Sequence, residues 1–141
     1  MKISMSGRES KSRGKGIMKQ HPIHFKAEFV ISEGKIKEFK KLIKEMSDLG
    51  KANEPDTISY QFYFDKPETK FIILEMSQNP EAVFAHIDGV GSNTVLPKIR
   101  DISRIARFEV YGPVNNKLRK AMEGLNPQAY LLFTGFNRLI R

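Results

Sequence analysis

The spacing of the apolar residues changes several times along this chain, and the order of the changes limits the fold more than any other feature. Four segments alternate apolar and polar residues or form short apolar runs, as strands do: residues 23–31, 56–65, 71–77 and 104–111. A turn-like stretch at residues 66–69 separates the second segment from the third. The sequence therefore predicts four strands, with a hairpin between the second and the third.

Between the first two strands the apolar spacing becomes helical. Side chains recur every three or four residues at Ile36, Phe39, Ile43 and Met46. Lysines occupy much of the opposite face. Ser32 suits an N-cap and Gly50 suits a helix end, so we expect an amphipathic helix between them.

The start of the second helix is the clearest local signal in the chain. Asn79 suits the N-cap, Pro80 the first helical position and Glu81 the positive end of a helix. Two glycines ten residues later interrupt this helix. Helical spacing then resumes, and Pro97 is acceptable there only in the first turn.

Two further elements follow the fourth strand. A short helix places Leu118, Met122 and Leu125 on one side, and residues 130–136 are typical of a last strand. The order strand, helix, strand, strand, helix, strand, with a helix and a strand appended, is the split βαβ pattern of ferredoxin-like folds. We therefore expect an α+β protein with helices on one face of an antiparallel sheet.

The face of that sheet opposite the helices is also expected to be buried. Tyrosine, phenylalanine, isoleucine and leucine fall on both faces of the predicted hairpin, so an uncovered sheet would expose a large apolar patch. Two sheets related by a two-fold axis would bury it, and such dimers are the most common closed assembly. We expect a homodimer.

The composition excludes several classes of site. The chain has no cysteine, which excludes disulfides, thiolate metal sites, iron–sulfur clusters and a cysteine nucleophile. No apolar run approaches the roughly 18 residues of a spanning helix, and residues 1–20 lack the apolar middle of a secretory signal. We expect a cytoplasmic protein without a membrane partner.

Most of the net charge of +8 belongs to the first 20 residues. They contain six cations and one anion, whereas the other 121 residues contain 18 cations and 15 anions. No apolar period fixes residues 1–20 to a core, so we expect a disordered basic tail followed by one domain over residues 21–141. The sequence leaves open whether Met18 is the natural start and whether the tail is only solvated or binds nucleic acid or a membrane surface.

Residues 53–88 resemble the signature stretch of antibiotic-biosynthesis monooxygenase domains. In that family an E-P-G-T-x-x-Y opening leads into a hairpin, an acidic residue near its end, and a helix of the S-x-E-A-x-x-A-H kind. The matching residues here are Glu54, Pro55, Thr57, Tyr60, Glu75, Glu81, Ala82, Ala85 and His86. Asp56 replaces the usual glycine. The resemblance extends over residues 23–141, whose last helix and strand resemble those of a subgroup of uncharacterised members.

The resemblance implies a dimeric α+β barrel with a cavity between the sheet and the helices of each subunit. Members of the family include cofactor-free oxygenases of phenols, anthrones or quinols, and enzymes that degrade haem. The chain has no tryptophan, which the haem-degrading and anthrone-oxidising members use in their pockets. Its first strand also lacks the asparagine of the haem-degrading branch, so haem degradation is disfavoured.

His86 and Glu75 are the candidate catalytic residues. An imidazole titrates near pH ~6.5 and suits a general base that removes a proton from an electron-rich substrate. The alternative is a structural His86 that packs at the helix end. Glu75 lies in an apolar run, where a carboxylate needs a partner, and it either orients His86 or pairs with a cation such as Arg107.

Four aromatic residues are candidates for binding the substrate. Tyr60, Phe62 and Phe64 form a stripe on one strand face that lines either a cavity or the core. Tyr111 is a weaker candidate, as a polar contact. No metal-ligand spacing, phosphate-binding loop or Ser-His-Asp pattern stands out, so we expect no metal and no cofactor.

The sequence therefore predicts a cofactor-independent monooxygenase, an oxidoreductase, for a small aromatic substrate of the phenol, quinol or anthrone kind. The main alternative is a non-catalytic ligand-binding or structural dimer of the same fold. A nucleic-acid-binding domain is less favoured, because the basic-Gly-aromatic strand of RNA-binding βαββαβ domains is missing and the charge of residues 21–141 is nearly balanced.

Overall fold

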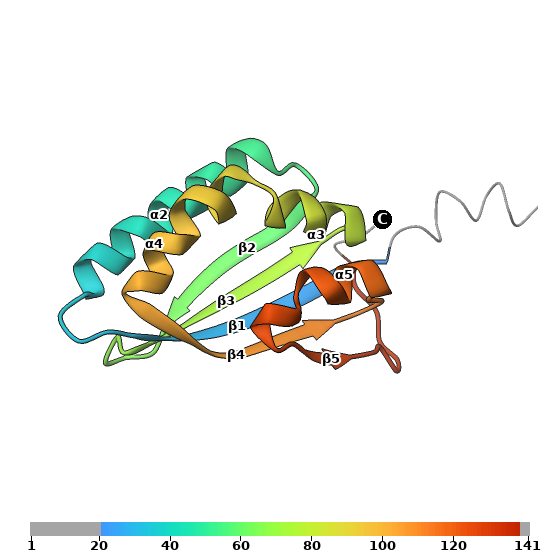
Figure 1. Cartoon of the computed structure of the whole chain (residues 1–141). Coiled ribbons are helices and arrows are strands. Elements are labelled where there is room, and N and C mark those ends of the chain that lie inside the picture. The colour runs from blue at the N-terminus through green and yellow to red at the C-terminus, as the bar shows by residue number, and fades with distance from the viewer. Residues whose placement is uncertain (1–20, 139–141) are drawn as a thin grey trace, which may run out of the picture.

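A five-stranded sheet determines how the rest of the molecule is arranged (Figure 1). The computed structural model describes residues 21–138, so the predicted basic tail and Met18 lie outside the described residues. The strands are, in chain order, β1 (Ile23–Ile31), β2 (Thr57–Phe64), β3 (Lys70–Ser77), β4 (Ser103–Tyr111) and β5 (Gln128–Tyr130). In space they follow the order β2-β3-β1-β4-β5, so β1 is the central strand.

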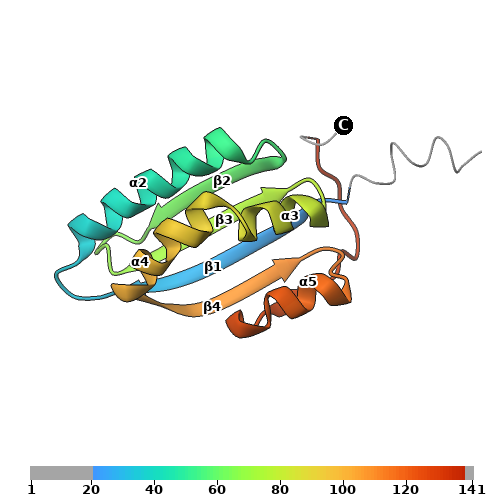
Figure 2. The ribbon, with the colours of Figure 1, turned by 45° about the horizontal axis from the view of Figure 1, so that its top comes forward.

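The helices lie on one side of this sheet (Figures 1 and 2). They are α2 (Ile36–Asn53), α3 (Pro80–Ile87), α4 (Leu96–Asp101) and α5 (Asn116–Ala121). A π-helical turn (Gly91–Val95) precedes α4, and a 3-10 turn (Glu123–Leu125) follows α5. The predicted α+β, ferredoxin-like order of elements is confirmed. Among the described residues no helix is long and apolar enough to cross a membrane.

The first helix differs from the prediction at both ends. Its N-cap is Lys35, without a side-chain capping bond, so the prediction of Ser32 was wrong. The Ser32 carbonyl instead accepts the Lys35 N–H in the preceding turn at 3.1 Å. α2 also continues three residues past Gly50. A Cβ at Gly50 would lie 3.1 Å from the Tyr60 ring, so this glycine permits close packing on β2 rather than ending the helix.

The predicted start of the second helix is confirmed. The Asn79 side-chain oxygen accepts the Ala82 N–H at 2.9 Å, and Pro80 is the first residue of α3. The glycines at 89 and 91 fall where α3 gives way to the π-helical turn, and Pro97 lies in the first turn of α4, as predicted.

The last strand lies earlier than predicted, since β5 shares only Tyr130 with the predicted residues 130–136, and it pairs differently. β5 pairs in parallel with β4, so the sheet is mixed rather than antiparallel throughout. Tyr130 ends β5 opposite Tyr111, the last residue of β4. Gly112 and Pro113 then end β4, which leaves the residues after Tyr130 without a strand partner. Four large apolar side chains of this segment are exposed: Leu131, Leu132, Phe133 and Phe136.

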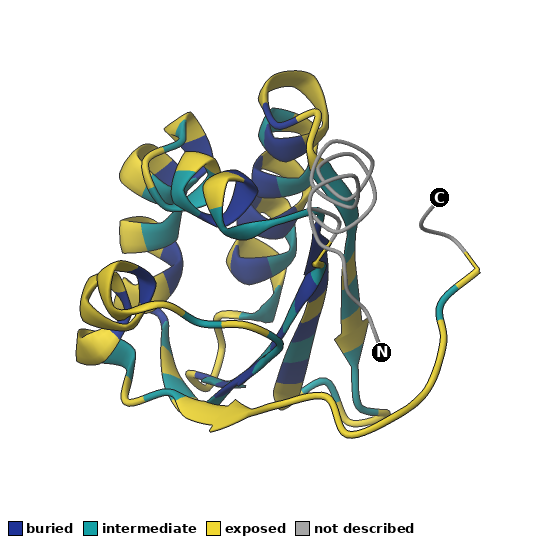
Figure 3. Ribbon diagram, turned by 90° about the vertical axis from the view of Figure 1, so that its right-hand side faces the viewer, coloured by how far each residue is buried: buried dark blue, intermediate teal, exposed yellow. Residues whose placement is uncertain are grey.

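The strand period of two separates a helix-facing side of the sheet from an open side. On β1 every second residue from Ile23 to Ile31 is buried under the helices. Phe62 and Phe64 of β2 face the same way and contact Phe71 of β3, with ring centroids 5.8 and 5.1 Å apart. Figure 3 shows the helices on this side of the sheet only.

The N-cap of α3 gives a direct test of the fold. Replacing Asn79 with alanine removes the acceptor for the Ala82 N–H, so we expect a loss of about 1 kcal/mol in the free energy of unfolding, measured with urea. Asn116→Ala is the control, because Asn116 is an exposed first residue of α5 whose cap is Asn115. Equal stability of Asn79→Ala and the wild type would contradict this role of the cap.

Candidate functional site

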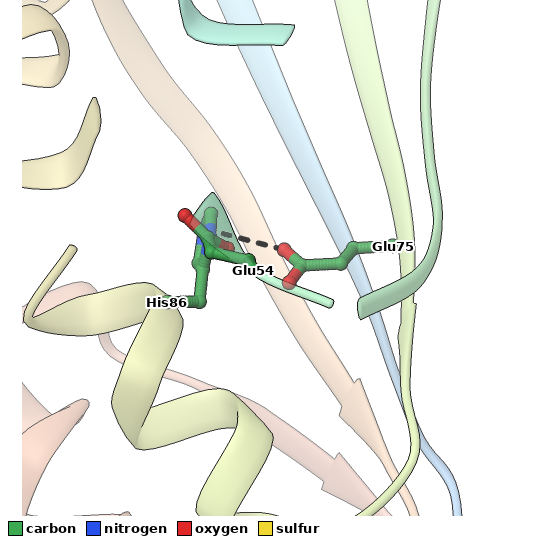
Figure 4. A group of neighbouring side chains, drawn as sticks. All are labelled: Glu54, Glu75 and His86. Carbon is green, nitrogen blue, oxygen red and sulfur yellow. Dashed lines mark hydrogen bonds and ion pairs between the residues drawn. The ribbon is translucent and has the colours of Figure 1, made fainter. Parts of the chain in front are cut away.

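One histidine lies between two buried glutamates on the helix-facing side of the sheet (Figure 4). His86 Nδ1 is 2.7 Å from Glu54 Oε1, and His86 Nε2 is 3.4 Å from Glu75 Oε1. The side chains of Glu54 and Glu75 are 5% and 4% exposed, and that of His86 is 18% exposed. Both ring nitrogens of His86 are therefore occupied by carboxylates.

Local structure places each member of this group. Glu54 is the C-cap of α2, where its N–H donates to the Gly50 carbonyl at 2.9 Å. Glu75 lies on the helix-facing side of β3, opposite Phe25 of β1. His86 is in the last turn of α3, whose start is fixed by the Asn79 cap. The Ser77 hydroxyl donates to the second Glu75 oxygen at 3.4 Å.

Burial and charge change the proton affinities of the group. Burial raises the pKa of Glu75 above its ordinary value, while the charge of His86 opposes the shift and Glu54 adds to it. Burial by itself would lower the pKa of His86, but the hydrogen bond to Glu54 and the charges of both carboxylates raise it above its ordinary value. Glu75 and His86 therefore retain protons to a higher pH than an isolated carboxyl and an isolated imidazole would.

A cavity of about 360 Å³ lies beside the group, between the sheet and the helices. Glu75 and His86 line it, whereas Glu54 lies behind the ring and does not. Much of the wall is apolar: Phe25, Phe29, Ile73, Val83, Ile105 and Phe108. The volume is near the lower end of the range for pockets that bind small molecules.

Tyr60 adds a hydroxyl to the same wall. Its ring meets the His86 ring edge-on, with centroids 5.2 Å apart. Burial raises the pKa of Tyr60 well above its ordinary value, and the charges of Glu75 and Glu54 raise it further. Tyr60 therefore stays protonated and keeps a hydroxyl proton that it can donate.

Known structures share this architecture. MupZ from Pseudomonas fluorescens is 24% identical, with a TM-score of 0.73 over 83% of this chain and 94% of MupZ. A candidate antibiotic biosynthesis monooxygenase from Caulobacter crescentus is 22% identical, with a TM-score of 0.61 over 73% of this chain and 99% of its own. SnoaB, a cofactor-independent oxygenase from Streptomyces nogalater, is 11% identical, with a TM-score of 0.58 over 68% and 96%.

The chain has the fold of the antibiotic biosynthesis monooxygenases. No protein-family model and no curated protein matches the sequence. The fold that the resemblance implied is thus confirmed, while the chemistry depends on the residues of the site.

Within this monooxygenase fold the predicted site residues fall into three places. His86, Glu75 and Tyr60 meet at the cavity. Phe62 and Phe64 pack in the aromatic core, and neither lines the cavity. Tyr111 lies on the open side of the sheet, opposite His24, and so does not join the site.

The proposed pairing of Glu75 with Arg107 was wrong. Arg107 bonds Glu109, next to Tyr111 on the open side of the sheet. Glu54 is the residue that the site prediction missed. The Glu-Pro opening of the family resemblance contained it, but nothing in the local sequence indicates that its carboxylate reaches a histidine 32 residues later.

Glu54, Glu75 and His86 also include the ligand types of divalent metal sites. One ligand atom of each lies within 4.8 Å of the others. Because Glu54 also holds Nδ1 on the far side of the ring from Glu75, the geometry favours proton sharing over a metal centre. The sequence revealed no such cluster, since its members are far apart along the chain.

The two partly buried histidines on opposite sides of the sheet should titrate in a fixed order. Burial lowers the pKa of His24, whereas the carboxylates raise that of His86. In an NMR titration we therefore expect the His24 midpoint below 6.5 and the His86 midpoint above it. The stabilisation from protonated His86 should be present below pH 6.5 and be lost as the pH rises through the raised pKa.

Glu54→Gln tests the cause of the shift. The amide keeps the shape but removes a charge, so the His86 midpoint should fall while that of His24 stays. A His86 midpoint that does not move in Glu54→Gln would contradict the assignment.

Proposed function

We propose that this protein is a cofactor-independent monooxygenase of a small aromatic substrate of the phenol, quinol or anthrone kind. The observation that carries the proposal is the proton-sharing group of Glu54, His86 and Glu75 at the wall of an apolar cavity. An apolar cavity can hold dioxygen beside a substrate anion, and a base with a pKa near the working pH can generate that anion. The shared fold with SnoaB, a cofactor-independent oxygenase, supports the proposal by analogy.

Glu75 is the better candidate for the base. The sequence analysis favoured His86, but both nitrogens of that ring contact carboxylates, and a ring held in this way has no free acceptor. Glu75 lines the cavity, and burial raises its pKa, which makes its ionised form a stronger base than an ordinary carboxylate. In this arrangement Glu54 and His86 position Glu75 and adjust its proton affinity.

An anthrone-like CH₂ carbon illustrates the balanced reaction. Glu75 removes one proton, and the resonance-stabilised carbanion transfers one electron to dioxygen. The resulting carbon radical and superoxide combine into a peroxide, which receives the proton back from Glu75. Removal of the second C–H proton then expels hydroxide, so that the substrate and O₂ become a carbonyl product and one water. The Tyr60 hydroxyl can donate a hydrogen bond to the substrate anion.

Oxygen uptake with a panel of hydroquinones and anthrones tests the proposal. In Glu75→Gln we expect turnover to fall by about 10²-fold or more, because the amide cannot accept the proton. Tyr111→Phe, on the open side of the sheet, is the control and should keep full activity. Full activity of Glu75→Gln would contradict the assigned base. Turnover without oxygen would rule out the oxygenase step, and no turnover of any substrate would favour a non-catalytic ligand-binding dimer.

We also propose that two copies pair through the open side of the sheet. This side carries partly exposed Tyr63, Leu74 and Tyr130, at 48%, 40% and 43%. The exposed apolar side chains of residues 131–136 follow directly after β5. Exposed apolar side chains that gather in this way are typical of protein–protein interfaces. A second copy offers the same surface in a two-fold arrangement.

The mass in solution tests this pairing. Light scattering at micromolar concentration should give twice the 16.2 kDa mass of one chain. Leu74→Glu, which places a charge on the open side, should shift the equilibrium toward the monomer. Val90→Glu is the control, because Val90 is 49% exposed but lies next to α3, on the helical side. The mass of a single chain for the wild type would contradict the proposal.

A further inference from the structure

The cavity extends along the sheet away from the proton-sharing group. Glu75 is opposite Phe25 of β1, and Ile105, which also lines the cavity, is opposite Phe29 of the same strand. These two positions on β1 are four residues apart, which corresponds to about 13 Å at the rise of a strand. A molecule that spans both positions is therefore elongated, and only one of its ends meets Glu75.

Arg100 is the one arginine or lysine among the described residues that line the cavity. It belongs to α4, which ends just before Ser103, and Ser103 pairs with Ile31 at one end of β1. α3 begins after Ser77, which pairs with Ile23 at the other end of β1. Arg100 thus lies toward the end of the cavity that is remote from the proton-sharing group.

The charge of Arg100 has no carboxylate partner among residues 21–138. The ion pairs of the described part of the chain join other cations, such as Arg107 with Glu109 and Lys40 with Glu68. Arg100 is exposed at the surface and still contributes to the cavity lining, which is otherwise largely apolar there: Phe29, Leu96 and Ile105. A guanidinium in this position can bind a carboxylate in a bidentate manner.

We propose that Arg100 determines specificity by binding the acidic group of an elongated aromatic substrate whose opposite end reaches Glu75. The substrate class is then an aromatic acid with a phenol or activated C–H group far from its carboxylate. This inference rests on the proposed function for the use of the cavity, but it concerns binding and not turnover. In the alternative, purely structural role, the aliphatic stem of Arg100 covers apolar surface while its guanidinium stays in water.

Binding of matched probes to the full chain separates these two roles. The probes are 6-hydroxynaphthalene-2-carboxylate, with its hydroxyl and its charge at opposite ends, and the corresponding neutral 2-carboxamide. Isothermal titration should show that the wild type binds the carboxylate about tenfold more tightly than the amide. In Arg100→Ala the affinity for the carboxylate should fall to the affinity for the amide. The affinity for the amide should equal that of the wild type.

Arg104→Ala is the matched control. Arg104 is also exposed, but it lies on β4 opposite Val30, on the open side of the sheet. Its loss should leave the tenfold preference unchanged. A second probe, 3-hydroxynaphthalene-2-carboxylate, carries its hydroxyl and its charge side by side. It should show a weaker dependence on Arg100, because it cannot reach both ends of the cavity.

Several results would overturn the inference. They are equal binding of carboxylate and amide by the wild type, an unchanged preference in Arg100→Ala, and a lack of binding of either probe. Thermal unfolding of Arg100→Ala at the wild-type midpoint would show that a lost preference does not come from misfolding. Tight binding that depends on Arg100, together with no oxygen uptake, would contradict the oxygenase and retain the acid-binding site.

Discussion

The helix-facing side of the sheet depends on one contact, in which two buried carboxylates meet the imidazole of His86. A carboxylate removed from water is costly unless it is paired or hydrogen-bonded, and Glu54 and Glu75 both meet that condition through His86. The three residues come from the end of α2, from β3 and from α3. Their contact therefore fixes how these elements meet, because loss of one partner leaves a buried charge without compensation.

The aromatic residues of the sheet perform two different tasks within one strand pattern. Between the sheet and α2 the rings of Phe29, Phe71 and Phe39, the last from α2 itself, contact one another, and all three are nearly inaccessible to solvent. Tyr60, on the same face of β2 as Phe62, lies next to the cavity instead. Tyr60 packs against Gly50 of α2 on one side and meets His86 of α3 on another, so its ring lies at the boundary between the aromatic core and the cavity.

The polarity of the cavity is what gives a common fold a particular chemistry. Glu75 and His86 lie toward one end, Arg100 lies toward the other, and apolar side chains line much of the space between them. Related folds share the sheet and the helices at 11–24% identity, a level at which wall residues are free to differ. The assignment of function therefore depends on Glu75, His86 and Arg100 more than on the architecture.

The order of elements and the Asn79 cap of α3 could be predicted from the amino-acid sequence. These signals are local, since capping, proline placement and apolar period act within a few residues. Three other features became visible only in the folded chain: Glu54 reaches His86 across 32 residues, Tyr111 faces away from the cavity, and β5 stops at Tyr130 in a parallel pairing. Such contacts depend on strand register and on where a neighbouring strand ends, which residues distant in the sequence determine together.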